Sequence, residues 1–226
     1  MEIGKGITKL KVSHEGNKLT FQYLPFKGTY GDVANVIDKE CLKRPTSPET
    51  ASLVYDAFQN RKGEHESQII KILNDAWLWE FTGNLYLPKS DEEISNGVIL
   101  EYNPKIENGK LVMDKNNLIK RLKENDSNVK FVPFGYKIGE QDLIELQKNS
   151  YIQARYGKEG AEKIVEIVSR YKKHPYIHSF DSVNQETKRM STMDWDWRLC
   201  NNLGIGGNDL DDGDYGRAFG IIPEDN

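Results

Sequence analysis

Two kinds of hydrophobic periodicity alternate along this chain of 226 residues, and together they restrict it to a mixture of strands and helices. Residues 7–12 and 19–24 alternate with period two around a Glu15-Gly16-Asn17 turn, which predicts a β-hairpin. Residues 64–77 and 158–171 carry apolar side chains at helical spacing. No linker or internal repeat separates these segments, so the pattern predicts mixed α and β structure packed into one body.

The remaining elements are predicted from caps and short apolar runs. Ser47 is expected to cap a helix, because Pro48 suits its first position and Glu49 suits its positive end. Asp114 is expected to cap another helix. Strands are predicted at 83–87, 97–102 and 129–134, and a further helix at 140–149.

Composition excludes several classes of protein. The chain has 31 basic and 35 acidic residues, a net charge of −4, and no basic stripe, so no nucleic-acid partner is expected. No run approaches the length of a membrane span. The two cysteines, Cys41 and Cys200, lie far apart, which argues against a disulfide framework or a cysteine zinc site. No signal segment is visible, which favours the cytoplasm by default, with the virion or the cell surface as alternatives.

Several motifs could bind metal or phosphate, and each has a simpler explanation. His174 and His178 flank Pro175, which favours a strand with surface histidines over a helical zinc pair. Residues 208–215 are rich in carboxylates, as in a calcium loop, but lack its spacing, so a solvated acidic loop is favoured. Residues 204–207 are glycine-rich, but no lysine follows to bind phosphate. No metal or cofactor is therefore expected.

Catalysis is the rival hypothesis. Cys200 has no neighbouring general base, and no Ser/His/Asp set can be assembled. A metal-dependent hydrolase would have to use the cluster Asp209, Asp211, Asp212 and Asp214. These aspartates lie in a continuous polar run rather than at apolar strand ends, which favours a protein that is not an enzyme. A structural or regulatory module with an ordinary C-terminal loop is the third possibility.

The C-terminal segment differs in composition from the rest of the chain. Between Arg198 and Ile222 there is no Lys, Glu, Gln, Met or Trp. These five types make up 57 of 226 residues, so about 6 are expected in a window of 25. Turn chemistry explains the abundant Gly, Asn and Asp. It explains the missing Lys and Glu less well.

This segment resembles the C-terminus of the variable proteins of diversity-generating retroelements, most closely their archaeal subclass. The resemblance rests on Trp195-Asp196-Trp197-Arg198-Leu199, the Gly/Asn/Asp stretch, and Gly216 to Ile221, with further similarity at 121–134 and 176–182. In that family an error-prone reverse transcriptase rewrites adenines in the gene, mostly in AAC-type codons. Changing the first two bases of such codons never yields the five missing residue types.

The resemblance implies a single C-type lectin-like domain over 1–226, with 1–90 as an integrated hairpin and helix pair and 194–222 as the variable region. Trp195, Trp197, Leu199, Ala218 and Phe219 would be scaffold, whereas Leu203, Ile205 and Leu210 could be either scaffold or variable. The ligand would be unknown, a protein or other macromolecule on another cell, and the acidic surface of this variant would suit a cationic or polar partner. The predicted ligand-facing positions are Asp196, Cys200, Asn201, Asn202, Gly204, Gly206, Gly207, Asn208, Asp209, Asp211, Asp212, Asp214 and Tyr215.

Overall fold

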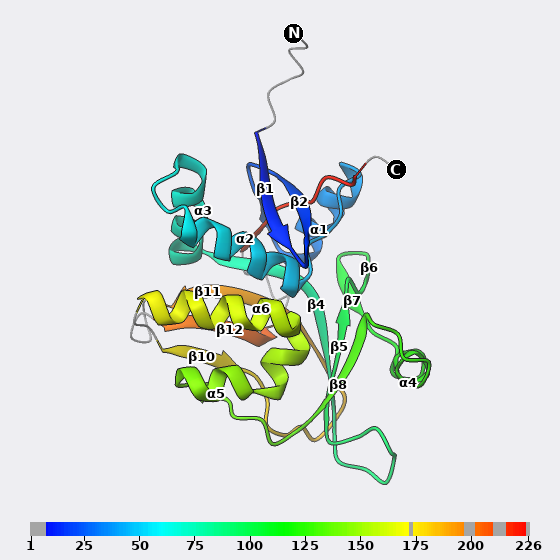
Figure 1. The fold of residues 1–226 in the computed structure, drawn as a ribbon. Coiled ribbons are helices and arrows are strands. Elements are labelled where there is room, and N and C mark those ends of the chain that lie inside the picture. Colours follow the sequence, from blue (N-terminus) through cyan, green and yellow to red (C-terminus); the bar gives the residue numbers. More distant parts are fainter. Residues whose placement is uncertain (1–7, 172–173, 197–201, 210–215, 225–226) are drawn as a thin grey trace.

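The structure is a computed structural model that describes residues 8–171, 174–196, 202–209 and 216–224. Within those ranges nine strands form one mixed sheet, in the order β3-β13-β4-β11-β12-β10-β9, with β5 and β8 added beside β4 (Figure 1). The strands are β1 (Lys9–His14), β2 (Asn17–Gln22), β3 (Phe26–Gly28), β4 (Trp77–Leu87), β5 (Gly97–Tyr102), β6 (Lys105–Glu107), β7 (Lys110–Val112), β8 (Val129–Pro133), β9 (Gly139–Glu140), β10 (Pro175–His178), β11 (Thr187–Asp196), β12 (Asn202–Asp209) and β13 (Gly216–Ala218). The helices are α1 (Tyr30–Lys39), α2 (Ser47–Gln59), α3 (Glu64–Asp75), α4 (Lys115–Lys123), α5 (Leu143–Lys148) and α6 (Ser150–Tyr171).

Strand β4 is the centre of the sheet, and its alternating side chains divide the interior into two sides. Leu78 and Tyr86 belong to the largest apolar cluster, together with residues of α2, α3 and α6. Trp79 and Phe81 point the other way and pack with α1, and Leu85 packs with α4. Because successive strand residues face opposite sides, the helices cover the sheet on both.

The two ends of the chain meet at one edge of this sheet. Strand β13 pairs with β3 on one side and with the start of β4 on the other. Ile221 forms isolated bridges to Phe21 and Lys43. The predicted scaffold residues Ala218 and Phe219 are buried there. The C-terminal strand therefore closes the part of the sheet that the N-terminal segments begin.

Many predicted elements are confirmed. The hairpin is present as β1 and β2, and the strands at 97–102 and 129–134 are β5 and β8. Asp114 caps α4 by accepting a 2.8 Å hydrogen bond from the amide of Asn117. The extended segment around Pro175 is β10.

Other expectations were wrong at the ends of elements. The cap of α2 is Thr46 rather than Ser47, because Glu49 completes a capping box with Thr46. Trp77 starts β4 instead of ending α3. Helix α6 begins at Ser150 and breaks at Gly157, where φ is +67°, so the predicted helix from Lys158 is only its second half. Helix α1 was missed altogether.

Candidate functional site

Strands β11 and β12 form an antiparallel pair whose two faces differ sharply. Trp195 lies opposite Leu203, and Met193 lies opposite Ile205. All four side chains are buried in the main core, and Trp195 packs against Phe58 of α2 at 5.8 Å between ring centroids. Leu203 and Ile205, which the sequence left as either scaffold or variable, are therefore scaffold.

The opposite side of the same strands is what we call the outer face of β12, made up of Asn202, Gly204 and Gly206 by strand alternation, and all three residues are buried. A Cβ built on Gly204 would lie 2.0 Å from a carboxylate oxygen of Asp194. One built on Gly206 would lie 2.1 Å from the hydroxyl of Thr192. Short polar side chains of β11 therefore lie across the glycines of β12.

Asp209 also lies over this face. The β11–β12 register shifts between Met190 and Thr192, and near this irregularity the Asp209 carboxylate accepts a 2.5 Å hydrogen bond from the Thr192 hydroxyl. The same carboxylate lies 2.1 Å from the Cβ position of Gly206. Irregular registers of this kind redirect side chains. Here Asp209, which comes last in the strand, joins the outer face.

Strand β10 continues the outer face with aromatic residues. It runs parallel to β12, and Tyr176 lies opposite Gly204 while His178 lies opposite Gly206. The two rings contact each other at 4.5 Å between centroids, and both side chains are half-buried. Strand alternation places them away from buried Ile177. A strip of glycine backbone thus lies between polar β11 and aromatic β10.

The core side of β12 is held by polar groups as well as by apolar ones. Arg155 of α6 is fully buried and donates hydrogen bonds to the carbonyl oxygens of Gly206, at 2.7 Å, and Thr192, at 2.8 Å. Tyr86 of β4 donates a 2.7 Å bond to the carbonyl of Gly207. Arg155 and Tyr86 therefore bind the main chain of β11 and β12 from the core side.

The charge of Arg155 is balanced by the equally buried Glu80 of β4. The same carboxylate accepts a 2.9 Å bond from the Ser47 hydroxyl and a bond from the Tyr156 phenol. Burial raises the pKa of the Tyr156 phenol well above its usual range, so this group remains a neutral donor. A buried ion pair requires such additional hydrogen bonds to offset its desolvation.

The predicted ligand-facing positions are only partly placed. Asn202, Gly204, Gly206 and Asp209 come together on the outer face, and Asn208 lies in the irregular stretch between Gly206 and Asp209. Asp196 pairs with Asn202 in the β11–β12 ladder. Predictions that fall outside the described residues concern Cys200, Asn201, Asp211, Asp212, Asp214 and Tyr215, together with the scaffold residues Trp197 and Leu199 and the ambiguous Leu210.

Gly207 is a correction. It lies on the core side, where a Cβ would be 1.8 Å from the phenol oxygen of Tyr151. The prediction treated Gly206 and Gly207 as one polar turn, but they are neighbours in a strand and therefore face opposite ways. Its position excludes it from a surface formed by the outer face.

Tyr176, His178, Thr192 and Arg155 are the residues of this region that sequence reasoning missed. For Tyr176 and His178 a signal was present, since they alternate with Pro175 and Ile177 in a strand-like segment. For Arg155 there was none, because its carbonyl partner Gly206 lies 51 residues away in the sequence.

The metal alternative that uses the aspartate cluster is only partly covered, because Asp211, Asp212 and Asp214 lie outside the described residues. The described residues contain no group of three or more His, Cys, Asp or Glu side chains that could hold a metal ion. His174 instead lies 3.5 Å from a carboxylate oxygen of Glu140. Among the described helices, none is long and apolar enough to cross a membrane.

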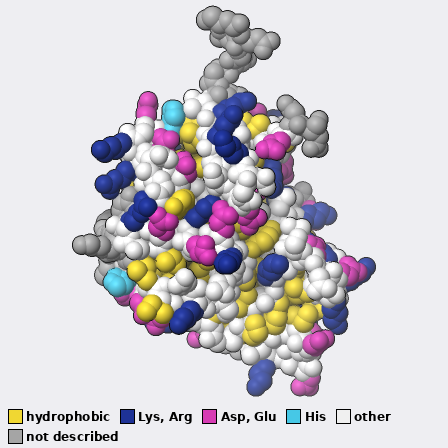
Figure 2. All heavy atoms as spheres, in the orientation of Figure 1, with side chains coloured by type: hydrophobic (Ala, Val, Ile, Leu, Met, Phe, Trp, Pro, Cys, Tyr) yellow, Lys and Arg dark blue, Asp and Glu magenta, His cyan; other side chains and the backbone are white. Residues whose placement is uncertain are grey.

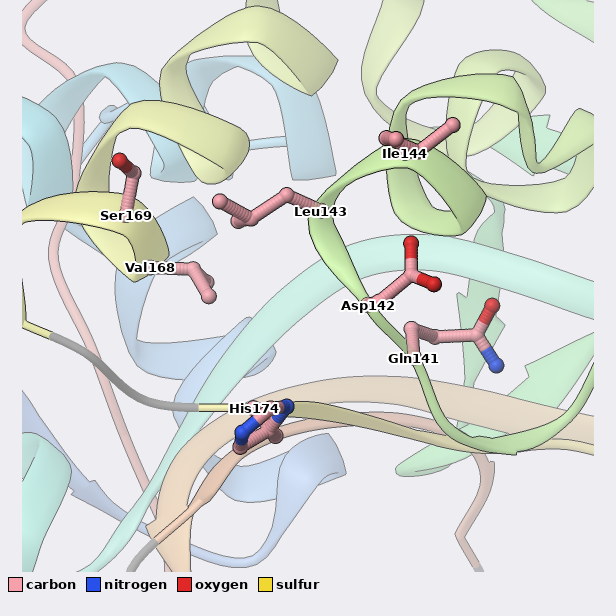
Figure 3. A pocket seen from close by; sticks show the side chains of 7 residues that line it. All are labelled: Gln141, Asp142, Leu143, Ile144, Val168, Ser169 and His174. Atoms are coloured by element: carbon pink, nitrogen blue, oxygen red, sulfur yellow. The ribbon is translucent and has the colours of Figure 1, made fainter.

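A groove of about 530 Å³ opens between α5, the end of α6 and the start of β10 (Figure 3). Leu143 and Val168 lie on its two sides, and Figure 2 shows apolar surface over α5 among interspersed acidic and basic side chains. Two of its polar residues support local structure, since Asp142 caps α5 and Gln141 donates to nearby carbonyls. Ser169 and His174 also line it.

The arrangement of the sheet and helices defines the class of fold. The chain is similar to a solved structure that shows how the C-type lectin fold accommodates massive sequence variation in Nanoarchaeota. The TM-score is 0.61 at 18% identity, and the similarity covers 88% of this chain and 98% of that one. The protein therefore has a C-type lectin fold of mixed helix and sheet. No protein-family model and no curated protein sequence matches it.

Proposed function

We propose that this chain is a ligand-binding display protein, not an enzyme, whose C-terminal segment 194–222 is diversified by a retroelement. The observation that carries the proposal is the outer face of β12. Its scaffold side chains, Leu203 and Ile205, point inward, and the outward positions carry glycine and short polar residues. A larger side chain at Gly204 or Gly206 would meet the ends of short polar side chains, Asp194 and Thr192, rather than the main apolar core.

Support also comes from the fold and the composition together. The structural neighbour combines a C-type lectin fold with massive sequence variation. In this chain the stretch from 198 to 222 lacks the five residue types that adenine-directed mutagenesis of AAC codons never produces. The ligand we propose is a protein or other macromolecule, because a broad sheet face suits an extended partner better than a small molecule.

Sequencing of the gene's own locus tests the diversification. We expect a near-copy of the segment that encodes Asp194 to Ile222 beside a reverse-transcriptase gene, with differences confined to template adenines. Such a repeat would also identify each variable position. A locus without a repeat or a reverse transcriptase would overturn this part of the proposal.

The hydrolase alternative has a separate test. A cation bound by Asp209 and its neighbours would stabilise the folded chain by mass action. We expect calcium or magnesium at millimolar concentration to leave the melting temperature unchanged, with the variant Asp209→Asn as the control. An increase of several degrees that Asp209→Asn abolishes would favour the hydrolase.

A further inference from the structure

The hydrogen bonds from Arg155 to β11 and β12 share one property. Its Nη1 and Nη2 groups donate to the carbonyl oxygens of Gly206 and Thr192, and these are main-chain atoms. A hydrogen bond to a carbonyl does not depend on which side chain the residue carries. The hold of Arg155 on β11 and β12 is therefore independent of the sequence of the outer face.

These two hydrogen bonds lie where the pairing of β11 and β12 is irregular. Thr192 and Gly206 are paired residues at the end of the β11–β12 register shift, in which β12 carries the extra residue. A bulge interrupts the regular ladder, so the strands lose mutual support there. Arg155 binds one carbonyl from each strand at this point and thereby links them. The planar guanidinium presents several donors in fixed directions, whereas a lysine ammonium is a single point charge.

The anchoring of Arg155 also avoids the display segment. Its Nε donates to Glu80 at 3.1 Å, and its Nη1 to the phenol of Tyr151 at 3.2 Å. Ser47 and Tyr156 complete the shell around Glu80. All of these side chains come from β4, α2 and α6, outside the segment 194–222. The whole support is thus encoded upstream of the residues proposed to vary.

We propose that Arg155 is the positioning residue of the display surface: it fixes the backbone of β11 and β12 through main-chain contacts and so makes folding insensitive to the side chains on the outer face. This inference rests on the proposed function. The inference names one residue, Arg155, that allows the same backbone to fold with many different side chains on the outer face.

The test compares the folding of libraries in three frames of the full chain. Asn202 and Asp209 are randomised together in the natural chain, in Arg155→Met and in Leu118→Ala. Leu118 is the buried residue of α4 and packs in a cluster that contains no residue of β12, so Leu118→Ala is the matched destabilised control. Displayed clones are then treated with protease at a concentration that leaves the same share of each unrandomised parent intact.

We expect the natural and Leu118→Ala frames to keep similar shares of folded clones and the Arg155→Met frame to keep about tenfold fewer, because coupled sites lose additivity. Equal losses in the Arg155→Met and Leu118→Ala frames would overturn the inference. If Arg155→Met does not fold, Arg155→Lys takes its place. We expect that variant to keep charge yet not restore tolerance, and full tolerance would overturn the inference.

Hydrogen exchange gives a second readout that general instability does not reproduce. At matched stability we expect amides of 202–209 to exchange faster in Arg155→Met than in Leu118→Ala, and unchanged rates would count against the inference. Both measurements report folding and not ligand binding. A negative result here therefore leaves the display proposal standing, whereas a locus without a template repeat refutes diversification and leaves the role of Arg155 intact.

Discussion

The phenol of Tyr86 on β4 donates a hydrogen bond to the carbonyl oxygen of Gly207 on β12, 121 residues further along the chain. Strand β11 lies between these two strands, so the bond passes beneath it. Tyr86 also contacts the Ser179 hydroxyl, 2.9 Å away, which in turn contacts the Tyr136 phenol. Strand β12 is thus attached to the centre of the sheet by a buried chain of hydroxyl groups.

Removal of the Tyr86 hydroxyl should destabilise the protein measurably. In Tyr86→Phe the buried carbonyl of Gly207 loses its donor, and we expect a loss of about 1–3 kcal/mol in the free energy of unfolding. Urea denaturation measures it. The control is Tyr176→Phe on the half-buried ring of β10, where we expect less than about 0.5 kcal/mol. Equal losses would contradict the described role of Tyr86.

Two glycines of β12 should respond differently to alanine. In Gly207→Ala the new methyl group meets the Tyr151 phenol, which is fixed by a 2.8 Å bond to Asn84, so we expect a loss of about 1–3 kcal/mol. In Gly204→Ala the methyl group meets the end of the half-buried Asp194 side chain. We expect less than about 1 kcal/mol there, because that carboxylate can rotate. Similar midpoints of thermal unfolding for the two variants would refute the assignment of faces.

The buried pair of Glu80 and Arg155 should show strong coupling. Removal of either partner leaves an uncompensated charge in the core, so each of Glu80→Ala and Arg155→Ala should cost about 3–5 kcal/mol. The double variant should cost clearly less than the sum, since neither charge remains unpaired. A double-mutant cycle in urea measures this coupling. Additive costs would show that the two side chains act separately.

Stability should fall steeply in alkali. Burial raises the pKa of Tyr102 to about 12 and raises the pKa of Tyr86 well above its usual range. A phenol of the unfolded chain ionises near pH 10. The folded state therefore retains protons that the unfolded state releases, so this contribution to stability is complete below pH 10 and lost as pH rises through about 12.

The slope of the free energy of unfolding against pH shows how many buried tyrosines contribute. Each such tyrosine should lower the free energy of unfolding by about 1.4 kcal/mol per pH unit within that window. Tyr102→Phe removes a hydrogen bond to the Ala154 carbonyl at every pH, which lowers stability uniformly. Its loss of stability per pH unit should nevertheless be smaller, by the contribution of one tyrosine. An unchanged slope would mean that the Tyr102 phenol ionises as readily in the folded protein as in the unfolded chain. Absorbance of tyrosinate follows the ionisation directly.

Periodicity was sufficient where a segment's own pattern decides its structure. The short apolar run in residues 97–102 predicted β5, and Asp114 predicted the start of α4. It failed at Trp77, because Ala76 and Trp77 continue the helical stripe of α3 while the chain there is already extended. Pairing of β4 with β11 and β13 outweighs local propensity at that point.

The candidate site was predictable only to the extent that it depends on local pattern. Leu203 and Ile205 could be recognised as candidate anchors, but two apolar residues in a polar run do not show which way the strand faces. Gly206 and Gly207 look alike in sequence and differ only through the register of β12. Arg155 was invisible, because its charge partner Glu80 is 75 residues away.

Strand β13 lies near the end of the segment proposed to vary, yet it pairs with both β3 and β4. A ribosome must therefore translate most of that segment, in frame, before the strand that completes this edge of the sheet exists. A stop codon or frameshift introduced upstream would leave Trp79 without its neighbour Gly216 and the adjoining edge of β3 unpaired. Such truncated products would be open to proteolysis, so only a chain translated in frame through β13 completes this edge of the sheet.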